Sequence, residues 1–253
     1  MFSKELYQTH LKTKFLGRGL KYLPQTNSTN ENTWEYFQNG SPEGTLVISD
    51  DQQKGKGRRQ NKWVSTKGKS LTFSILLCPE MKLERLGLLP LLTGVSIVEA
   101  IKSAASIQTG LKWPNDIMLN EKKMGGILVE SKSGQNGLGV VVGVGLNINE
   151  SEQDIPDSLS KQATSLAIYS NSSYSRELIL SAILNEFEQL YQNQMDDIIP
   201  LWQDYCIHRD TSVTFHTDTQ QCQGIFQGIN SLGHAEIKIN GKTESYSAGM
   251  VAI

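Results

Sequence analysis

Val140-Val141-Val142-Gly143-Val144-Gly145-Leu146 is apolar almost throughout, as is typical of a central strand covered on both faces. The predicted strand extends over 138–147. Earlier in the chain, similar apolar runs predict strands at 45–49, 71–77, 107–112 and 125–131. Apolar residues at three-and-four spacing predict helices over 29–39, over 88–105 and from about residue 175. Residues 1–205 are therefore predicted to form one α/β (α+β) domain, a sheet flanked by helices, behind a polar leader.

The pattern changes after Tyr205. Short strands are predicted over 212–216, 222–229, 233–239 and 242–247, and Asn240-Gly241 is a strong signal for a hairpin turn. Residues 206–253 are therefore predicted to form a small all-β C-terminal module of about the size of an SH3-like barrel.

Composition narrows the class of protein. With 253 residues, 38% of them hydrophobic, and a net charge of -2, the chain can bury a core and has no overall charge that favours nucleic acid or an anionic membrane. No apolar run approaches the roughly 18 residues of a membrane span, and residues 1–5 do not resemble a secretory signal. The three cysteines, Cys78, Cys206 and Cys222, have unrelated spacings and are expected to be free thiols. A cytoplasmic location is expected.

A basic segment departs from this neutral background. Seven lysines and arginines fall between residues 54 and 69, and no acidic residue occurs between Gln52 and Pro79. Gly55 and Gly57 are expected to allow positive φ and close approach to a ligand, while Lys56 and Arg58 can bind phosphate or carboxylate. Composition alone favours a solvated basic loop or a nucleic-acid patch over such a ligand loop. The loop is expected to be mobile without ligand.

Two further segments carry residues that a structural role does not explain. Lys112-Trp113-Pro114-Asn115-Asp116 is predicted to be a strand that ends in a turn, but a lysine beside a tryptophan in that strand needs another reason. Lys123, shortly before Gly125-Gly126, is expected at a sheet end, where ligands commonly bind. In Gly143-Val144-Gly145-Leu146-Asn147 the alternate glycines leave a bare strip on which a flat group can lie, and Asn147 can contact a heterocycle.

Taken together, these motifs resemble those of the biotin protein ligases. The family carries a Ser-Thr-Asn, a glycine- and arginine-rich loop that ends in a basic residue and tryptophan, a Lys-Trp-Pro-Asn-Asp string, a Lys-x-Gly-Gly-Ile-Leu-Val-Glu strand and a Gly-x-Gly-x-Asn-x-Asn strand. In this sequence they stand at Ser28–Asn30, Gly55–Trp63, Lys112–Asp116, Lys123–Glu130 and Gly143–Asn149. The resemblance implies a mixed sheet of the class II aminoacyl-tRNA synthetase type.

The resemblance also implies a reaction: biotin and MgATP give biotinyl-5′-AMP, which a lysine of a biotin carboxyl carrier protein then attacks. The implied catalytic residues are Lys123, Arg58, Lys112 and Asp116. The implied biotin-binding residues are Ser28, Thr29, Asn30, Gln52, Gly55, Lys56, Gly57, Arg58 and Lys123. The implied ATP-binding residues are Lys56, Arg58, Trp63, Lys123 and Asn147, with Mg²⁺ accompanying ATP and no metal ligand assigned.

The sequence departs from the family pattern at two positions, because Lys56 stands where arginine is usual and Gln60 where glycine is frequent. About 25 residues precede Ser28, too few for the helix-turn-helix of the bifunctional repressor-ligases, so no DNA binding is expected. A lipoate or octanoate ligase and a non-catalytic nucleic-acid-binding module are the alternatives. The sequence leaves monomer and homodimer open.

Overall fold

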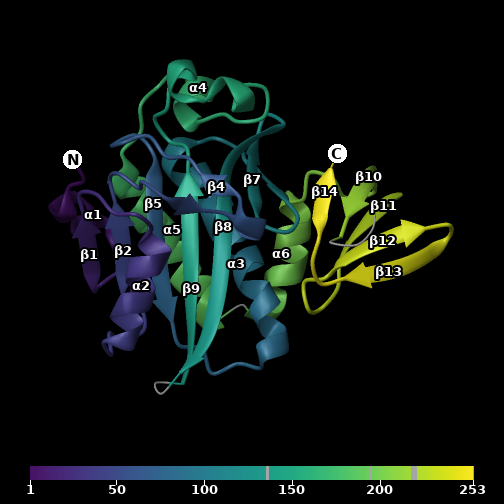
Figure 1. Ribbon diagram of the computed structural model, residues 1–253, viewed down its shortest axis with the longest axis horizontal. Helices are drawn as coiled ribbons and strands as arrows, with labels where there is room; N and C mark the ends of the chain where they lie inside the picture. The colour runs from purple at the N-terminus through teal and green to yellow at the C-terminus, as the bar shows by residue number, and fades with distance from the viewer. Residues whose placement is uncertain (135–136, 194, 218–220, 253) are drawn as a thin grey trace.

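The main sheet has seven strands and is mixed, as predicted. The computed structural model describes residues 1–134, 137–193, 195–217 and 221–252 (Figure 1). The strand order is β1-β2-β5-β9-β8-β7-β6, with β1 and β2 parallel and every other neighbouring pair antiparallel. The strands are β1 (Leu20–Leu23), β2 (Leu46–Ser49), β5 (Leu71–Leu77), β6 (Gly110–Lys112), β7 (Asp116–Leu119), β8 (Lys122–Gly134) and β9 (Gly137–Leu146).

Helices cover both faces of this sheet. α2 lies on one face, and α3 lies on the other with α5 packed against it (Figure 1). The helices are α1 (Lys4–His10), α2 (Thr29–Gln38), α3 (Leu89–Ala105), α4 (Leu166–Ser170), α5 (Arg176–Asn193) and α6 (Ile198–Tyr205), with short 3-10 turns at Arg58–Gln60, Leu83–Leu88, Glu152–Asp154, Asp157–Leu159 and Met195–Asp197.

Strand alternation gives the two faces of the sheet different chemistry. In β5 and β9, Phe73, Ile75, Val142 and Val144 join the main core beneath α3. Their sequence neighbours point to the α2 face, because successive side chains of a strand alternate. There Ser74 and the glycines of β9 give a small or polar surface at one end, whereas Leu76 and Val141 pack against apolar residues of α2. This face is therefore the one that can accept a polar ligand.

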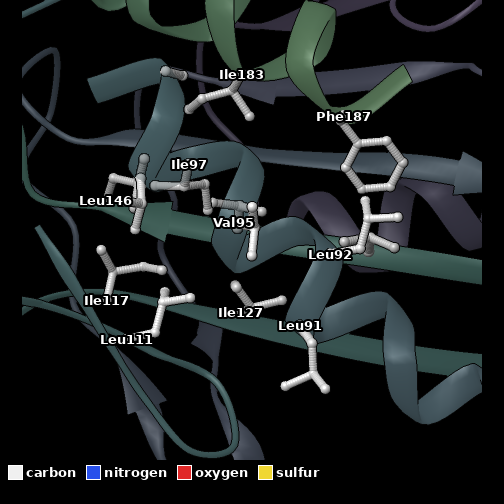
Figure 2. Packing of buried hydrophobic residues seen from close by; sticks show 14 of the residues in the cluster. Leu91, Leu92, Val95, Ile97, Leu111, Ile117, Ile127, Leu146, Ile183 and Phe187 are labelled. Carbon is white, nitrogen blue, oxygen red and sulfur yellow. The ribbon is translucent and has the colours of Figure 1, made fainter. Parts of the chain in front are cut away.

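The core helix α3 is apolar around most of its circumference. Figure 2 shows Leu91, Leu92, Val95 and Ile97 packed against strand residues and against α5. With the preceding 3-10 turn, Leu83–Ala105 is long and apolar enough to cross a membrane by length and composition alone, but 67% of the apolar window is buried inside the protein. Its apolarity reflects contact with the sheet on one side and α5 on the other, so it is a core helix.

The N-terminal segment is part of the fold, so the expectation of a polar leader was wrong. Phe2, Tyr7, Leu11 and Leu16 are buried in the main core. Their spacing is irregular because α1 ends at His10, so periodicity did not reveal them. The Tyr7 hydroxyl donates to the Gly17 carbonyl at 3.0 Å and ties α1 to the following turn.

The C-terminal residues form a separate five-stranded antiparallel sheet of order β13-β12-β11-β10-β14. It lies beside α6 (Figure 1) and joins the main domain at the Lys112–Asp116 turn: the Trp113 indole N–H donates to the Gly233 carbonyl at 3.0 Å. Nearby, His208 is fully buried against Phe226, and burial lowers its pKa from 6.5 to about 4, assisted by the charge of Lys112. The strands are β10 (Thr211–His216), β11 (Gln221–Ile229), β12 (Ala235–Ile239), β13 (Lys242–Tyr246) and β14 (Met250–Ala252).

Candidate active site

Lys123 lies beside Asp116 in paired strands. Its Nζ is 2.5 Å from Asp116 Oδ1, and β7 pairs with β8 through a register shift between Ile117 and Met118. The Lys123 backbone is fixed on its other side as well, since its N–H donates to the Gln162 carbonyl at 2.7 Å and its carbonyl accepts from Thr164 N at 3.0 Å. The backbone of Lys123 is thus fixed by hydrogen bonds on both sides, and its ammonium is held by the Asp116 carboxylate.

Gly126 lies against that lysine, and a Cβ there would make only ordinary van der Waals contact with it. A Cβ at Gly126 would lie 3.4 Å from Lys123 Cε and 3.5 Å from Nζ. Lys122 takes a different direction, and its Nζ donates to the Ser160 carbonyl at 3.1 Å on the exposed surface. The two adjacent lysines therefore have different surroundings.

The first turn of α2 presents a polar network to the same face of the sheet. Thr29 N donates to Gln52 Oε1 at 2.9 Å, and Asn30 Nδ2 donates to Glu130 Oε2 at 2.8 Å. Ser74, from β5, donates to Asn30 Oδ1 at 2.6 Å. Helix, loop and two strands are linked by these bonds, which fix the amide groups at this end of the site.

The basic segment folds into a short hairpin, β3 (Gly55–Lys56) paired with β4 (Lys62–Trp63). The expectation of positive φ at Gly55 and Gly57 was wrong, because the left-handed residue is Arg59, with φ 52°. Gly55 is needed for another reason: a Cβ there would lie 2.4 Å from the Trp63 carbonyl oxygen. Close packing of the two hairpin strands is the constraint. The side chain of Gln60 lies outside the described residues.

The two cations implied for the acyl-phosphate lie on this hairpin. Lys56 Nζ is 2.7 Å from Glu31 Oε1, and that hydrogen bond raises the pKa of Lys56. Arg58 Nη1 lies 3.4 Å from Asn115 Oδ1 and 3.5 Å from the Gly249 carbonyl, so Arg58 touches both the Lys112–Asp116 turn and the C-terminal segment.

The alternate glycines of β9 are covered by protein side chains. A Cβ at Gly143 would lie 2.1 Å from Asn30 Oδ1, and one at Gly145 would lie 2.4 Å from Trp63 Cε2. The flat group over Gly145 is thus the Trp63 indole, whose buried N–H has no hydrogen-bond partner among the residues that the structure describes. Trp63 anchors the hairpin to the sheet and keeps one donor unused.

These elements enclose a cavity of ≈ 200 Å³. Its wall is built by most of the residues singled out in the sequence: Ser28, Thr29, Asn30, Gln52, Lys56, Gly57, Arg58, Trp63, Lys112, Asp116 and Lys123. A second cavity of ≈ 800 Å³ shares Trp63, Lys112, Asp116 and Lys123 with the first and continues to Asn147. We call them the inner and the outer cavity. Lys123 and Asp116 therefore face both.

Comparison with known proteins agrees with this geometry. The family model of the Biotin/lipoate A/B protein ligase family matches residues 22–147. The bifunctional ligase/repressor BirA of Bacillus subtilis is 36% identical over 244 residues, covering 94% of this chain and 75% of that protein. The biotin--[acetyl-CoA-carboxylase] ligase of Mycobacterium tuberculosis is 27% identical, covering 97% and 95%.

The biotin protein ligase of Aquifex aeolicus in complex with biotin and ATP has the same fold, with a TM-score of 0.80 and 28% identity over 93% of this chain and 98% of that one. The chain belongs to the biotin protein ligases of the biotin/lipoate A/B protein ligase family. The resemblance inferred from the motifs is confirmed.

Two residues expected to bind ligand are placed away from the inner cavity of the ligase. Asn147 lines only the outer cavity, where its Nδ2 donates to the Thr164 carbonyl at 3.0 Å. Gly55 is buried at the hairpin pairing and lines neither cavity. Asn147 is thus placed apart from the residues of the α2 end, and Gly55 acts through the backbone.

The contribution of the C-terminal sheet to this site was not predicted from the sequence. Met250 and Val251 line the inner cavity, and Ala252 lines the outer one. No motif marks these residues, since β14 is three residues long. Asn115 was quoted within its motif, but the 2.8 Å bond from its Nδ2 to the Ile127 carbonyl, which orients it toward Arg58, follows from the fold alone.

Proposed function

We propose that this ligase attaches biotin to a lysine of a biotin carboxyl carrier protein, such as that of acetyl-CoA carboxylase, through biotinyl-5′-AMP. The observation that carries the proposal is the shared wall of the two cavities. One cavity ends in the polar network at α2 and the other leads to Asn147, and the cation of Lys123 lies where they meet. This arrangement suits a carboxylate approaching from one side and a phosphate from the other.

In the first step a carboxylate oxygen of biotin attacks the α-phosphorus of ATP, and the bond to the β-phosphate breaks to release pyrophosphate. Two anions must approach each other, so cations at the junction stabilise the charge that develops on the phosphoryl oxygens. We assign this role to Lys123, with Asp116 holding its ammonium at 2.5 Å. Thr29 and Gln52 would hold the ring system of biotin at the far end of the inner cavity.

In the second step the carrier lysine, as the free amine, attacks the acyl carbon of the adenylate. The acyl–phosphate bond breaks, AMP leaves with the electron pair, and the amine loses one proton. Until the carrier arrives, the adenylate must be kept from water. Arg58 and Lys56 lie on the hairpin that covers the inner cavity, and we assign them to retaining the acyl-phosphate.

We propose that ATP is used as its magnesium complex. Mg²⁺ prefers carboxylate oxygens together with phosphates. Asp116 and Glu121 bring carboxylates to the outer cavity, so the chemistry of its wall fits the ion. The adenine would lie near Asn147. We further infer that the reaction takes place in the cytoplasm without DNA binding, by a monomer or a homodimer.

Intact-mass spectrometry of a biotin carboxyl carrier domain tests the proposal. After incubation with the ligase, biotin and MgATP, the carrier should gain one biotinyl group, and a carrier whose target lysine is replaced by arginine should gain none. Transfer of lipoate in place of biotin would favour the lipoate ligase alternative. Salt-dependent binding of DNA or RNA without any transfer would favour the nucleic-acid-binding alternative.

A further inference from the structure

Arg176, the first residue of α5, bridges the two ends of the basic segment. It is buried, with 5% of its surface exposed. Its Nη2 is 2.8 Å from Asp50 Oδ1, and its Nη1 donates to the Ser70 carbonyl at 3.0 Å. Asp50 directly follows β2, and Ser70 directly precedes β5. One guanidinium therefore joins the point where the basic segment leaves the sheet to the point where it returns.

The partner carboxylate is fully engaged. Asp50 Oδ2 accepts from the Tyr22 hydroxyl at 2.7 Å and from Phe2 N at 3.3 Å, and the Asp50 carbonyl accepts from Gly68 N at 2.9 Å. Burial opposes ionisation of Asp50, but the hydrogen bonds from Tyr22 and Arg176 outweigh it and lower the pKa. The negative charge of Asp50 is thus fixed in place at the N-terminal end of the basic segment.

The other end is tied to the outer cavity. Ser70 Oγ accepts from Thr66 N at 2.7 Å and donates to Glu150 Oε1, while Lys69 Nζ lies 2.5 Å from Asp154 Oδ2. Glu150 and Asp154 both line the outer cavity. The junction formed by Arg176, Asp50 and Ser70 at the base of the basic segment is therefore in contact with the wall of the outer cavity, where we place the nucleotide.

We propose that Arg176 is a positioning residue for the reaction: it holds the base of the basic segment so that Arg58 and Lys56 stay over the inner cavity. The inference rests on the proposed function. A buried ion pair adds little to stability compared with apolar residues of the same size, so stability alone does not account for this one. The planar fork of arginine reaches a carboxylate and a carbonyl at once, which the single ammonium of lysine does not.

Arg176→Lys tests the proposal, with Glu188→Gln as the matched control. Glu188 lies on the same helix, is equally buried, and accepts from Phe15 N at 3.0 Å and Leu16 N at 2.9 Å. Its hydrogen bonds within the described part of the chain go to the backbone of residues 14–16, and twelve residues of helix, about 18 Å, separate it from Arg176. Asp50→Asn is a second variant that weakens the same junction from its other side.

Three quantities are measured for each variant: the melting temperature, the half-life of enzyme-bound biotinyl-adenylate without carrier, and tryptic cleavage within residues 54–69 with biotin bound. We expect Arg176→Lys and Asp50→Asn to shorten the adenylate half-life about tenfold and to expose the segment to trypsin, since small displacements at a reacting centre have effects of this order or larger. We expect Glu188→Gln to lower the melting temperature and leave the other two unchanged.

The proposal is overturned if, in all three variants, the losses of adenylate half-life and of protection from trypsin are proportional to the fall in melting temperature. Arg176 would then act only through stability. It is also overturned if Arg176→Lys leaves both unchanged in a folded protein. A wild-type protein that forms no biotinyl-adenylate would instead contradict the proposed function, so the two failures are distinguishable.

Discussion

The two sides of the inner cavity are built in different ways. On the strand side, Lys123 and Asp116 lie in paired strands, and the backbone of Lys123 is bonded on both edges. On the loop side, Lys56 and Arg58 lie on a hairpin of two-residue strands, within the 21 residues that connect β2 to β5 outside the main sheet. A group that must meet a developing charge gains from rigid placement, whereas a cover must open for substrate and carrier. We therefore expect the strand side to govern formation of the adenylate and the loop side its retention.

The largest effect is expected on the strand side. Lys123→Ala should slow pyrophosphate release by about a hundred- to a thousandfold at saturating biotin and MgATP, since it removes one preorganised donor worth about 3–4 kcal/mol. Lys122→Ala is the control, because its ammonium contacts only the surface carbonyl of Ser160 among the described residues. If the rate of pyrophosphate release falls by the same factor in both variants, or falls more in Lys122→Ala, the placement of the catalytic lysine is wrong.

The next effect concerns the junction of the Lys112–Asp116 turn with the C-terminal sheet. Buried His208 has a pKa near 4 in the folded protein and an ordinary value of 6.5 when unfolded. The unfolded chain therefore binds the proton first, and stability present above pH 6.5 is lost as the pH falls toward 4, by up to about 3 kcal/mol. Denaturant unfolding at pH 7 and pH 5 should show about 2 kcal/mol of this loss.

Substitution of the histidine gives the control for that measurement. In His208→Gln the difference in unfolding free energy between pH 7 and pH 5 should shrink, whereas His10→Gln, on the exposed surface of α1, should keep it. An unchanged difference in His208→Gln would assign the acid sensitivity to another group.

On the loop side a smaller effect is expected. Arg58→Ala should speed release of the adenylate by about tenfold to a hundredfold, as loss of one charged hydrogen bond costs about 1.5–3 kcal/mol. Trapping of released biotinyl-adenylate by a large excess of unlabelled adenylate measures the rate. Arg59→Ala is the neighbouring control on the same turn, and equal acceleration in both variants would mean that only the overall charge of the loop matters.

The smallest effect is expected at Lys56. Its ion pair with Glu31 is about half exposed, and such pairs contribute about 1 kcal/mol or less. Lys56→Arg should remain active and slow adenylate release by about twofold to fivefold, because a guanidinium can bind the acyl-phosphate with two hydrogen bonds. A folded but inactive Lys56→Arg enzyme would show that this loop has been matched wrongly to the family pattern.

The same contrast explains what could be predicted from the sequence. Strands β2, β5, β8 and β9 and helices α2, α3 and α5 were predicted to within a few residues, because continuous apolar runs and three-and-four spacing mark them. The short strands β1 and β7 and the helices α1, α4 and α6 were not predicted. Lys123, Asp116 and Arg58 were identified because they lie in short motifs. All three line one cavity.

Contacts between distant segments could not be predicted in this way. Arg176 is an ordinary helix residue in the sequence, and its role emerges only when Asp50 and Ser70 are brought to it across more than 100 residues. Val251 reaches the site because a second sheet docks on Trp113. In the hairpin the positive φ lies at Arg59, whereas Gly55 is required by close packing against Trp63.

Parallel measurement of both steps in Lys123→Ala and Arg58→Ala tests the division between the two sides most directly. For each enzyme, the rate of pyrophosphate formation and the half-life of bound biotinyl-adenylate supplied ready-made are determined in the same buffer. We predict that Lys123→Ala loses mainly the formation rate and that Arg58→Ala loses mainly the half-life. Loss of both quantities in the same proportion in the two variants would contradict the account.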